Sequence, residues 1–136
     1  NIVREGRDVT LVATSSMRQV CEKAADLLSE DGISAEIIDP RTIVPLDETT
    51  ILSSVKKTSR AIVVDEGHQS YGVAAEIASI ISEKAFYHLD APVIRMGAMD
   101  VPVPFSPVLE DLTVPTPELV AQNARKIVFG EMIHGL

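Results

Sequence analysis

Two short polar segments carry the side chains that could do chemistry in this chain. Thr14-Ser15-Ser16 lies between an apolar run of the strand type and a helical pattern, and Asp65-Glu66 follows a second apolar run. Hydroxyl groups at the start of a helix can bind an anion or cap the helix. Adjacent carboxylates can act as acid and base where their surroundings separate their pKa values. Both segments are expected at the carboxyl edge of a parallel sheet, where ligands usually bind.

Neither segment completes a recognised catalytic or phosphate-binding pattern. The first lacks G-x-G-x-x-G and Walker patterns, and Ser16 with Gln19 forms an S-x-x-Q capping box, so capping is favoured over phosphate binding. A receiver-type phosphorylation site would need an acidic pair after the first strand, where this chain has hydroxyl residues. A structural role is therefore expected for the acidic segment.

The remaining reactive side chains form no catalytic or metal-binding pattern. Cys21, the single cysteine, falls on the apolar face of the first helical pattern and is expected in the core. His68, His88 and His134 lack the spacing of zinc ligands. We therefore predict no catalytic, cofactor-binding or metal-binding residue in this chain, and we expect His68 at a subunit surface.

The composition indicates one acidic domain with an aliphatic core. The chain has 136 residues, 46% hydrophobic residue types and a net charge of −8. This charge disfavours nucleic acid and membranes as partners, and it suits either a basic partner protein or solubility alone. No apolar run is long enough to span a membrane, and the single cysteine fits a reducing compartment, the cytoplasm or the mitochondrial matrix.

Strands and helices alternate in the hydrophobic pattern. Strands are expected over 8–13, 33–38, 61–64 and 92–96, and helices over 17–30, 49–57, 73–86 and 117–129. Asp47 and Thr116 are expected to cap the second and last helices, and Gly32 to end the first. The order of elements predicts a three-layer α/β/α open sheet, mostly parallel, with about five strands. The stretch 97–115 contains P-V-P-F-S-P, for which a rigid connector is favoured over a polyproline ligand.

A set of motifs in a fixed order resembles one protein family. The motifs are D-V-T-L-V-A, I-S-A-E-I-I-D-P-R-T-I-V-P-L-D, I-L-S-S-V-K-K-T-S-R-A-I-V-V-D-E-G, G-V-A-A-E-I-A, F-Y-H-L-D-A-P-V-I-R-M, D-V-P-V-P-F and P-T-P-E-L-V. From Val9 to Gly130 the chain resembles the transketolase-type C-terminal domain of the beta subunit of thiamin-diphosphate-dependent 2-oxo-acid dehydrogenases, of the pyruvate, branched-chain or acetoin type. Because the first residue is Asn1, the resemblance implies a single-domain fragment, 1–136, preceded by about 190 further residues.

The resemblance implies a role in a larger enzyme. In such an enzyme, two alpha and two beta subunits form a tetramer, and thiamin diphosphate with a divalent cation binds between alpha and the N-terminal domain of beta. The enzyme decarboxylates a 2-oxo acid and transfers the acyl group to a lipoyl group of the acyltransferase component. This domain would bind no cofactor and would be inactive alone. It would support contact between beta subunits and dock the basic subunit-binding domain of the acyltransferase.

The resemblance also places two candidate interfaces on the chain. Subunit contacts are expected at Gly67, His68, Tyr71, Gly72, Val73 and Glu76, and acyltransferase docking is expected at Asp90 and near the C-terminal tail. The sequence departs from the family after Gly67, because a bulky aromatic residue often follows this glycine in relatives. Two other interpretations stay open: the C-terminal domain of a transketolase or deoxyxylulose-phosphate synthase, and an unrelated, stand-alone flavodoxin-like binding module.

Overall fold

The structure is a computed structural model that describes residues 1–40, 46–66, 73–97, 110–111 and 115–130. The strands are β1 (Ile2–Arg4), β2 (Val9–Ala13), β3 (Ala35–Ile38), β4 (Ala61–Val64), β5 (Ile94–Met96) and β6 (Glu110–Asp111). The helices are α1 (Arg18–Glu30), α2 (Glu48–Thr58), α3 (Val73–Lys84) and α4 (Pro117–Phe129), with 3₁₀ turns η1 (Ser15–Met17) and η3 (Phe86–His88). None of the described helices is long and apolar enough to cross a membrane.

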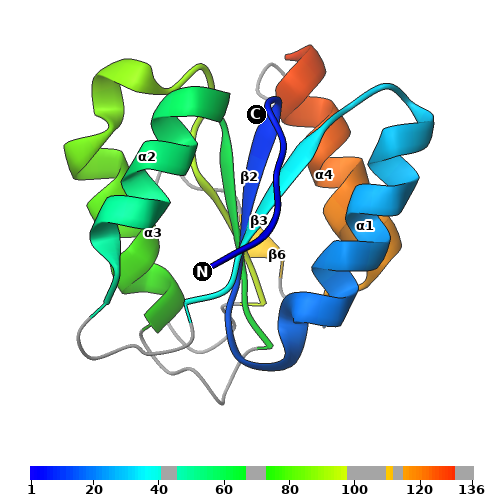
Figure 1. The fold of residues 1–136 in the computed structure, drawn as a ribbon, viewed down its shortest axis with the longest axis horizontal. Coiled ribbons are helices and arrows are strands. Elements are labelled where there is room, and N and C mark those ends of the chain that lie inside the picture. The colour runs from blue at the N-terminus through cyan, green and yellow to red at the C-terminus, as the bar shows by residue number, and fades with distance from the viewer. Residues whose placement is uncertain (41–45, 67–72, 98–109, 112–114, 131–136) are drawn as a thin grey trace.

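In the described residues, one sheet of six strands runs through the centre in the order β1-β3-β2-β4-β5-β6. Strands β2 to β6 pair in parallel, and β1 pairs antiparallel with β3. Helices α1 and α4 cover one face of this sheet, and α2 and α3 cover the other (Figure 1). The predicted three-layer, mostly parallel architecture is therefore confirmed.

Alternate residues of the central strands enter two separate cores. Leu11 and Ile37 face α1 and α4, whereas Val12 and Ile38 face α2 and α3, and all four are at most 1% exposed. Burying an aliphatic side chain of this size contributes about 1.5–3 kcal/mol. Because both faces of the central strands are covered, their sequences are mostly apolar, and β4 (A-I-V-V) is apolar throughout.

Three residues, Gly32, Asp47 and Thr116, end or cap their helices as predicted. Gly32 has φ of +77°, its N–H donates to the Ser29 carbonyl at 3.0 Å, and the next residue, Ile33, donates to the Leu28 carbonyl at 3.0 Å. This is the Schellman arrangement that favours glycine. The Asp47 carboxylate accepts from the Thr50 N–H at 3.1 Å and so caps α2.

The predicted capping box at Ser16 and Gln19 is wrong. The chain enters α1 through η1, where the Met17 N–H donates to the Thr14 carbonyl at 3.0 Å. Ser16 therefore lies inside a turn instead of before the helix, and no side chain caps either η1 or α1.

A threonine, predicted from the sequence as a cap, directly precedes α4 and caps it. The Thr116 hydroxyl accepts from the Leu119 N–H at 3.1 Å, and Pro117 occupies the first helical position. We expect Thr116→Ala to lower the free energy of unfolding by about 1 kcal/mol, because a helix N–H loses its acceptor. Urea unfolding measures this loss, and Thr116→Ser, which keeps the hydroxyl, serves as the control. Equal stability of all three proteins would contradict the prediction.

Candidate docking site

The carboxyl ends of β2 and β4 are joined by the two polar segments that the sequence contains there. The Thr14 hydroxyl donates to the Val64 carbonyl at 3.1 Å and to the Asp65 carboxylate at 2.9 Å, and Thr14 and Asp65 are both buried. The Ser16 hydroxyl donates to the Glu66 carboxylate at 2.6 Å. Because these groups satisfy one another, the arrangement holds strand ends together and provides no activated nucleophile.

The other reactive side chains form no catalytic centre in the described part of the chain. Burial, with a smaller contribution from Glu22, raises the pKa of the Cys21 thiol to about 12, so this core thiol stays protonated. His88 is exposed in η3, and His68 and His134 lie outside the described residues. Within the described ranges, no three His, Cys, Asp or Glu side chains are grouped to hold a metal ion.

Most residues of the predicted subunit contact lie outside the described part of the chain. Gly67, His68, Tyr71 and Gly72 lie outside the described residues, as does the P-V-P-F-S-P segment. The two remaining residues of this set, Val73 and Glu76, lie in the first turn of α3, where Val73 is half-buried and Glu76 is exposed. The contact therefore stays a prediction.

A groove of about 530 Å³ lies between the end of α3 and the start of β5. It is lined by Ser82, Phe86, Tyr87, Leu89, Asp90, Ala91, Pro92 and Val93. Phe86 is 62% exposed and Tyr87 is 94% exposed, and their rings meet edge to face with centroids 5.3 Å apart. Exposed aromatic side chains of this kind are typical of protein–protein interfaces.

The local chain path explains why both rings are exposed. Helix α3 ends at Lys84, the buried Ala85 closes it by donating to the Ile81 carbonyl at 2.9 Å, and η3 then turns the next residues outward. The predicted helix over 73–86 is therefore two residues too long. The aromatic pair was not predicted from the sequence, because the expected helix was extended as far as Phe86.

Asp90, the predicted docking residue, lies in this groove. Its backbone N–H donates to the Ser59 carbonyl at 2.8 Å, and its side chain is 63% exposed. One carboxylate oxygen lies 3.8 Å from Nη2 of Arg60. The groove thus combines an anchored but solvent-accessible carboxylate with two exposed aromatic rings. This combination suits a partner that carries basic and apolar side chains.

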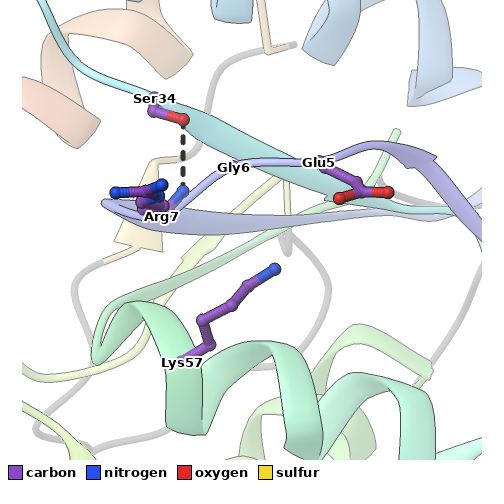
Figure 2. Close-up of a pocket in the computed structure, with 5 residues that line it drawn as sticks. All are labelled: Glu5, Gly6, Arg7, Ser34 and Lys57. Carbon is purple, nitrogen blue, oxygen red and sulfur yellow. Dashed lines mark hydrogen bonds between the residues drawn. The ribbon is translucent and has the colours of Figure 1, made fainter.

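A second, polar pocket of about 220 Å³ lies near the amino ends of β2 and β3. It is lined by Glu5, Gly6, Arg7, Ser34 and Lys57, with Lys57 reaching from α2 toward the segment that contains Gly6 (Figure 2). A Cβ atom on Gly6 would lie 2.3 Å from the carbonyl carbon of Ala35, so this close backbone approach requires glycine.

The side chain of Glu36 links two of the residues that line this pocket, Gly6 and Lys57. One of its carboxylate oxygens accepts from Lys57 Nζ at 2.5 Å and from the Gly6 N–H at 3.0 Å, and Glu36 is 1% exposed. Burial alone would raise the pKa of Glu36, but these donors and Ser54 together hold the pKa below its usual value. Because Lys57 is committed to this carboxylate, the pocket provides structural support and no free catalytic amine.

The polar network extends from Glu36 into the interface between the sheet and α2. The Thr10 hydroxyl on β2 lies 2.7 Å from the hydroxyls of both Ser54 and Thr58 on α2. All three residues are at most 2% exposed. This network was not predicted, although the sequence carries a signal of it in the single charged residue inside the apolar run A-E-I-I.

The sequence matches the family described as "Transketolase, C-terminal domain" over residues 1–120. It is 48% identical to the acetoin:2,6-dichlorophenolindophenol oxidoreductase subunit beta of Bacillus subtilis (strain 168), over 88% of this chain and 35% of that protein. It is 46% identical to the mitochondrial pyruvate dehydrogenase E1 component subunit beta-1 of Arabidopsis thaliana, over 94% of this chain and 35% of that protein. The chain spans about a third of the length of these curated relatives.

Solved structures agree on the fold. A split gene transketolase, solved as an inactive beta4 tetramer, superposes with a TM-score of 0.73 over 95% of this chain and 42% of that chain, at 24% identity. A 2-oxoglutarate:ferredoxin oxidoreductase from Magnetococcus marinus gives a TM-score of 0.60 at 16% identity, over 94% of this chain and 20% of that chain. At these identities the structural likeness establishes the α/β/α fold alone.

Proposed function

The chain belongs to the transketolase C-terminal domain family, and on this premise we propose that it is the C-terminal domain of the beta subunit of a thiamin-diphosphate-dependent 2-oxo-acid or acetoin dehydrogenase component. The observation that carries this proposal is its 46–48% identity to beta subunits of that kind. The domain would serve assembly and docking, and the parent enzyme would be the oxidoreductase. One of these relatives is bacterial and the other is named as mitochondrial, so we propose that this chain works in the cytoplasm of a bacterium or in the mitochondrial matrix.

In the parent enzyme, thiamin diphosphate would be held with a divalent cation. On the family resemblance, we propose that this cofactor binds between the alpha subunit and the N-terminal domain of beta. Within the described ranges, the carboxylates at the sheet edge, Asp65 and Glu66, are already bonded to the Thr14 and Ser16 hydroxyls. The partners in assembly would be an alpha subunit and a second beta subunit, with Val73 and Glu76 at the contact.

We propose the groove around Asp90 as the place where the acyltransferase docks. The subunit-binding domain expected as partner is basic, and this chain carries a net charge of −8. The anchored Asp90 carboxylate would meet a basic side chain, and the Phe86–Tyr87 pair would cover apolar surface beside it. Charges supply steering and register at such interfaces, whereas buried aromatic anchors supply much of the affinity.

Calorimetry with the isolated subunit-binding domain of an acyltransferase tests the docking proposal. We expect micromolar or tighter binding that weakens with salt, and we expect Asp90→Asn and Tyr87→Ser each to weaken it about tenfold. Two variants away from the groove serve as controls: Glu30→Gln in α1 for the loss of charge, and Ile2→Ser in β1, at the far edge of the sheet, for the loss of an exposed apolar side chain. No binding at either low or high salt by the folded chain would contradict the proposal.

The second candidate from the same family is the C-terminal domain of a transketolase or deoxyxylulose-phosphate synthase. These enzymes act on sugar phosphates. An unrelated flavodoxin-like module is at odds with the family match. The full gene separates the two family members. Cofactor-binding regions fused in the same chain would support the sugar-phosphate enzyme, and a separate gene for an alpha subunit would support the dehydrogenase.

A further inference from the structure

A partly buried cation lies directly beside the carboxylate of the docking groove. Arg60 follows α2, and its side chain is 22% exposed, whereas that of Asp90 is 63% exposed. Nη1 of Arg60 donates to the Asp8 carbonyl at 3.2 Å and approaches the Thr58 carbonyl at 3.5 Å, while Nη2 lies 3.8 Å from the Asp90 carboxylate. The guanidinium is therefore held from one side by backbone carbonyls and faces Asp90 with the other.

The backbone fixes the two charges near each other. The Arg60 carbonyl accepts from the Thr10 N–H at 2.8 Å, which ties Arg60 to the sheet. The neighbouring Ser59 has φ of +65°, and its carbonyl accepts from the Asp90 N–H at 2.8 Å. The carbonyls of Asp8 and Thr58 hold the guanidinium itself on the side of Asp90.

The guanidinium is also incompletely satisfied. Its Nε atom is buried and has no hydrogen-bond partner among the described residues. A buried donor without an acceptor carries a desolvation cost, and this atom does not contribute to holding the side chain in place. Replacement by methionine, which keeps the apolar stem and removes this donor, is therefore expected to leave the chain folded.

We propose that Arg60 is an affinity-determining residue of the docking groove, acting as an internal counterion of Asp90 that weakens the capture of a basic partner. This inference rests on the proposed docking function. A cation that reaches Asp90 from the solvent meets a carboxylate whose charge is already partly compensated, and it is repelled by Arg60 at short range. Between partly solvated charges separated by about 6–8 Å, this repulsion weakens binding about threefold at low salt. Docking would thereby stay reversible.

Binding of the isolated subunit-binding domain to Arg60→Met tests this proposal. We expect this variant to bind about threefold more tightly than the wild type at low salt, with the difference vanishing at high salt. Lys23→Gln, on the exposed side of α1 across the sheet, removes one positive charge far from the groove and controls for net charge. Equal tightening by Lys23→Gln, or no tightening by Arg60→Met, would overturn the proposal.

A double-mutant cycle tests the underlying ion pair without any partner. Urea unfolding of wild type, Arg60→Met, Asp90→Asn and the double variant should give a coupling factor of about two to five in the unfolding equilibrium constant. A factor of one would overturn the proposal. Failure of every variant to bind the subunit-binding domain would overturn the docking function itself, whereas binding without the Arg60 effect would overturn the counterion role alone.

Discussion

Replacing Gly97 by alanine is expected to lower the free energy of unfolding by about 3–5 kcal/mol. Gly97 follows β5 with φ of +84°, and a Cβ atom there would lie 1.9 Å from the carbonyl oxygen of Asp65. The positive φ alone costs a non-glycine residue about 1–2 kcal/mol. The overlap adds more, because Asp65 is buried, donates its N–H to the Met96 carbonyl at 3.0 Å and cannot easily move.

Gly32→Ala is the matched control for this measurement. Gly32 has a similar φ of +77°, but nothing lies within 4 Å of the position of its Cβ atom. We expect this variant to lose only about 1 kcal/mol in urea unfolding. If Gly97→Ala lost no more stability than Gly32→Ala, the carboxyl ends of β4 and β5 could move apart without cost. The close approach of Gly97 to Asp65 would then not be required for stability.

Local sequence signals were sufficient to predict the central sheet and most helix ends. The apolar runs around Leu11, Ile37 and Ile62 could be recognised because strands covered on both faces contain few polar residues. Capping by Asp47 and Thr116 followed from side chains that bond to N–H groups three residues away. Each of these signals is contained within a few neighbouring residues, so one sequence can reveal it.

Features that depend on distant segments could not be predicted in this way. Strands β1 and β6 have three and two residues, too few for any periodicity, and they exist only because a neighbouring strand offers its edge. Ser16 looks like a cap in the sequence, but its acceptor is Glu66, fifty residues away. Long-range hydrogen bonds of this kind leave no local pattern.

The candidate site was predicted in part, and for different reasons. Asp90 came from the family resemblance, because an exposed carboxylate has no distinguishing local signal. The neighbouring pair of Phe86 and Tyr87 was missed because the predicted helix was extended to Phe86, whereas α3 ends at Lys84. Arg60 was missed because its relation to Asp90 depends on how the end of α2 meets the chain before β5.

Replacing Lys57 by methionine is expected to lower the free energy of unfolding at pH 7 by about 2 kcal/mol. Removal of one partner from a fully buried ion pair costs about 3–5 kcal/mol. Here Glu36 is 1% exposed but Lys57 is 46% exposed, so solvent reduces the effect, and the Gly6 N–H and Ser54 still stabilise the carboxylate. Urea unfolding measures the loss.

The loss should depend on pH with a defined sign. In the wild type, the pKa of Glu36 in the folded chain lies below its ordinary value of 4.5, so its contribution to stability is present above that value and is lost as the pH falls through the folded pKa. Without Lys57, burial raises this pKa, and the folded variant binds the proton more readily. The difference between variant and wild type should therefore shrink between pH 7 and about pH 3.

Lys56→Met provides the matched control, since it makes the same substitution at the preceding, exposed position of α2. We expect it to change the free energy of unfolding by less than about 0.5 kcal/mol at either pH. Glu36→Gln, which removes the charge and keeps the shape, should abolish the pH dependence of the Lys57 effect. A loss for Lys57→Met that is the same at both pH values would show that Lys57 acts through packing of its methylene groups instead of through its charge on Glu36.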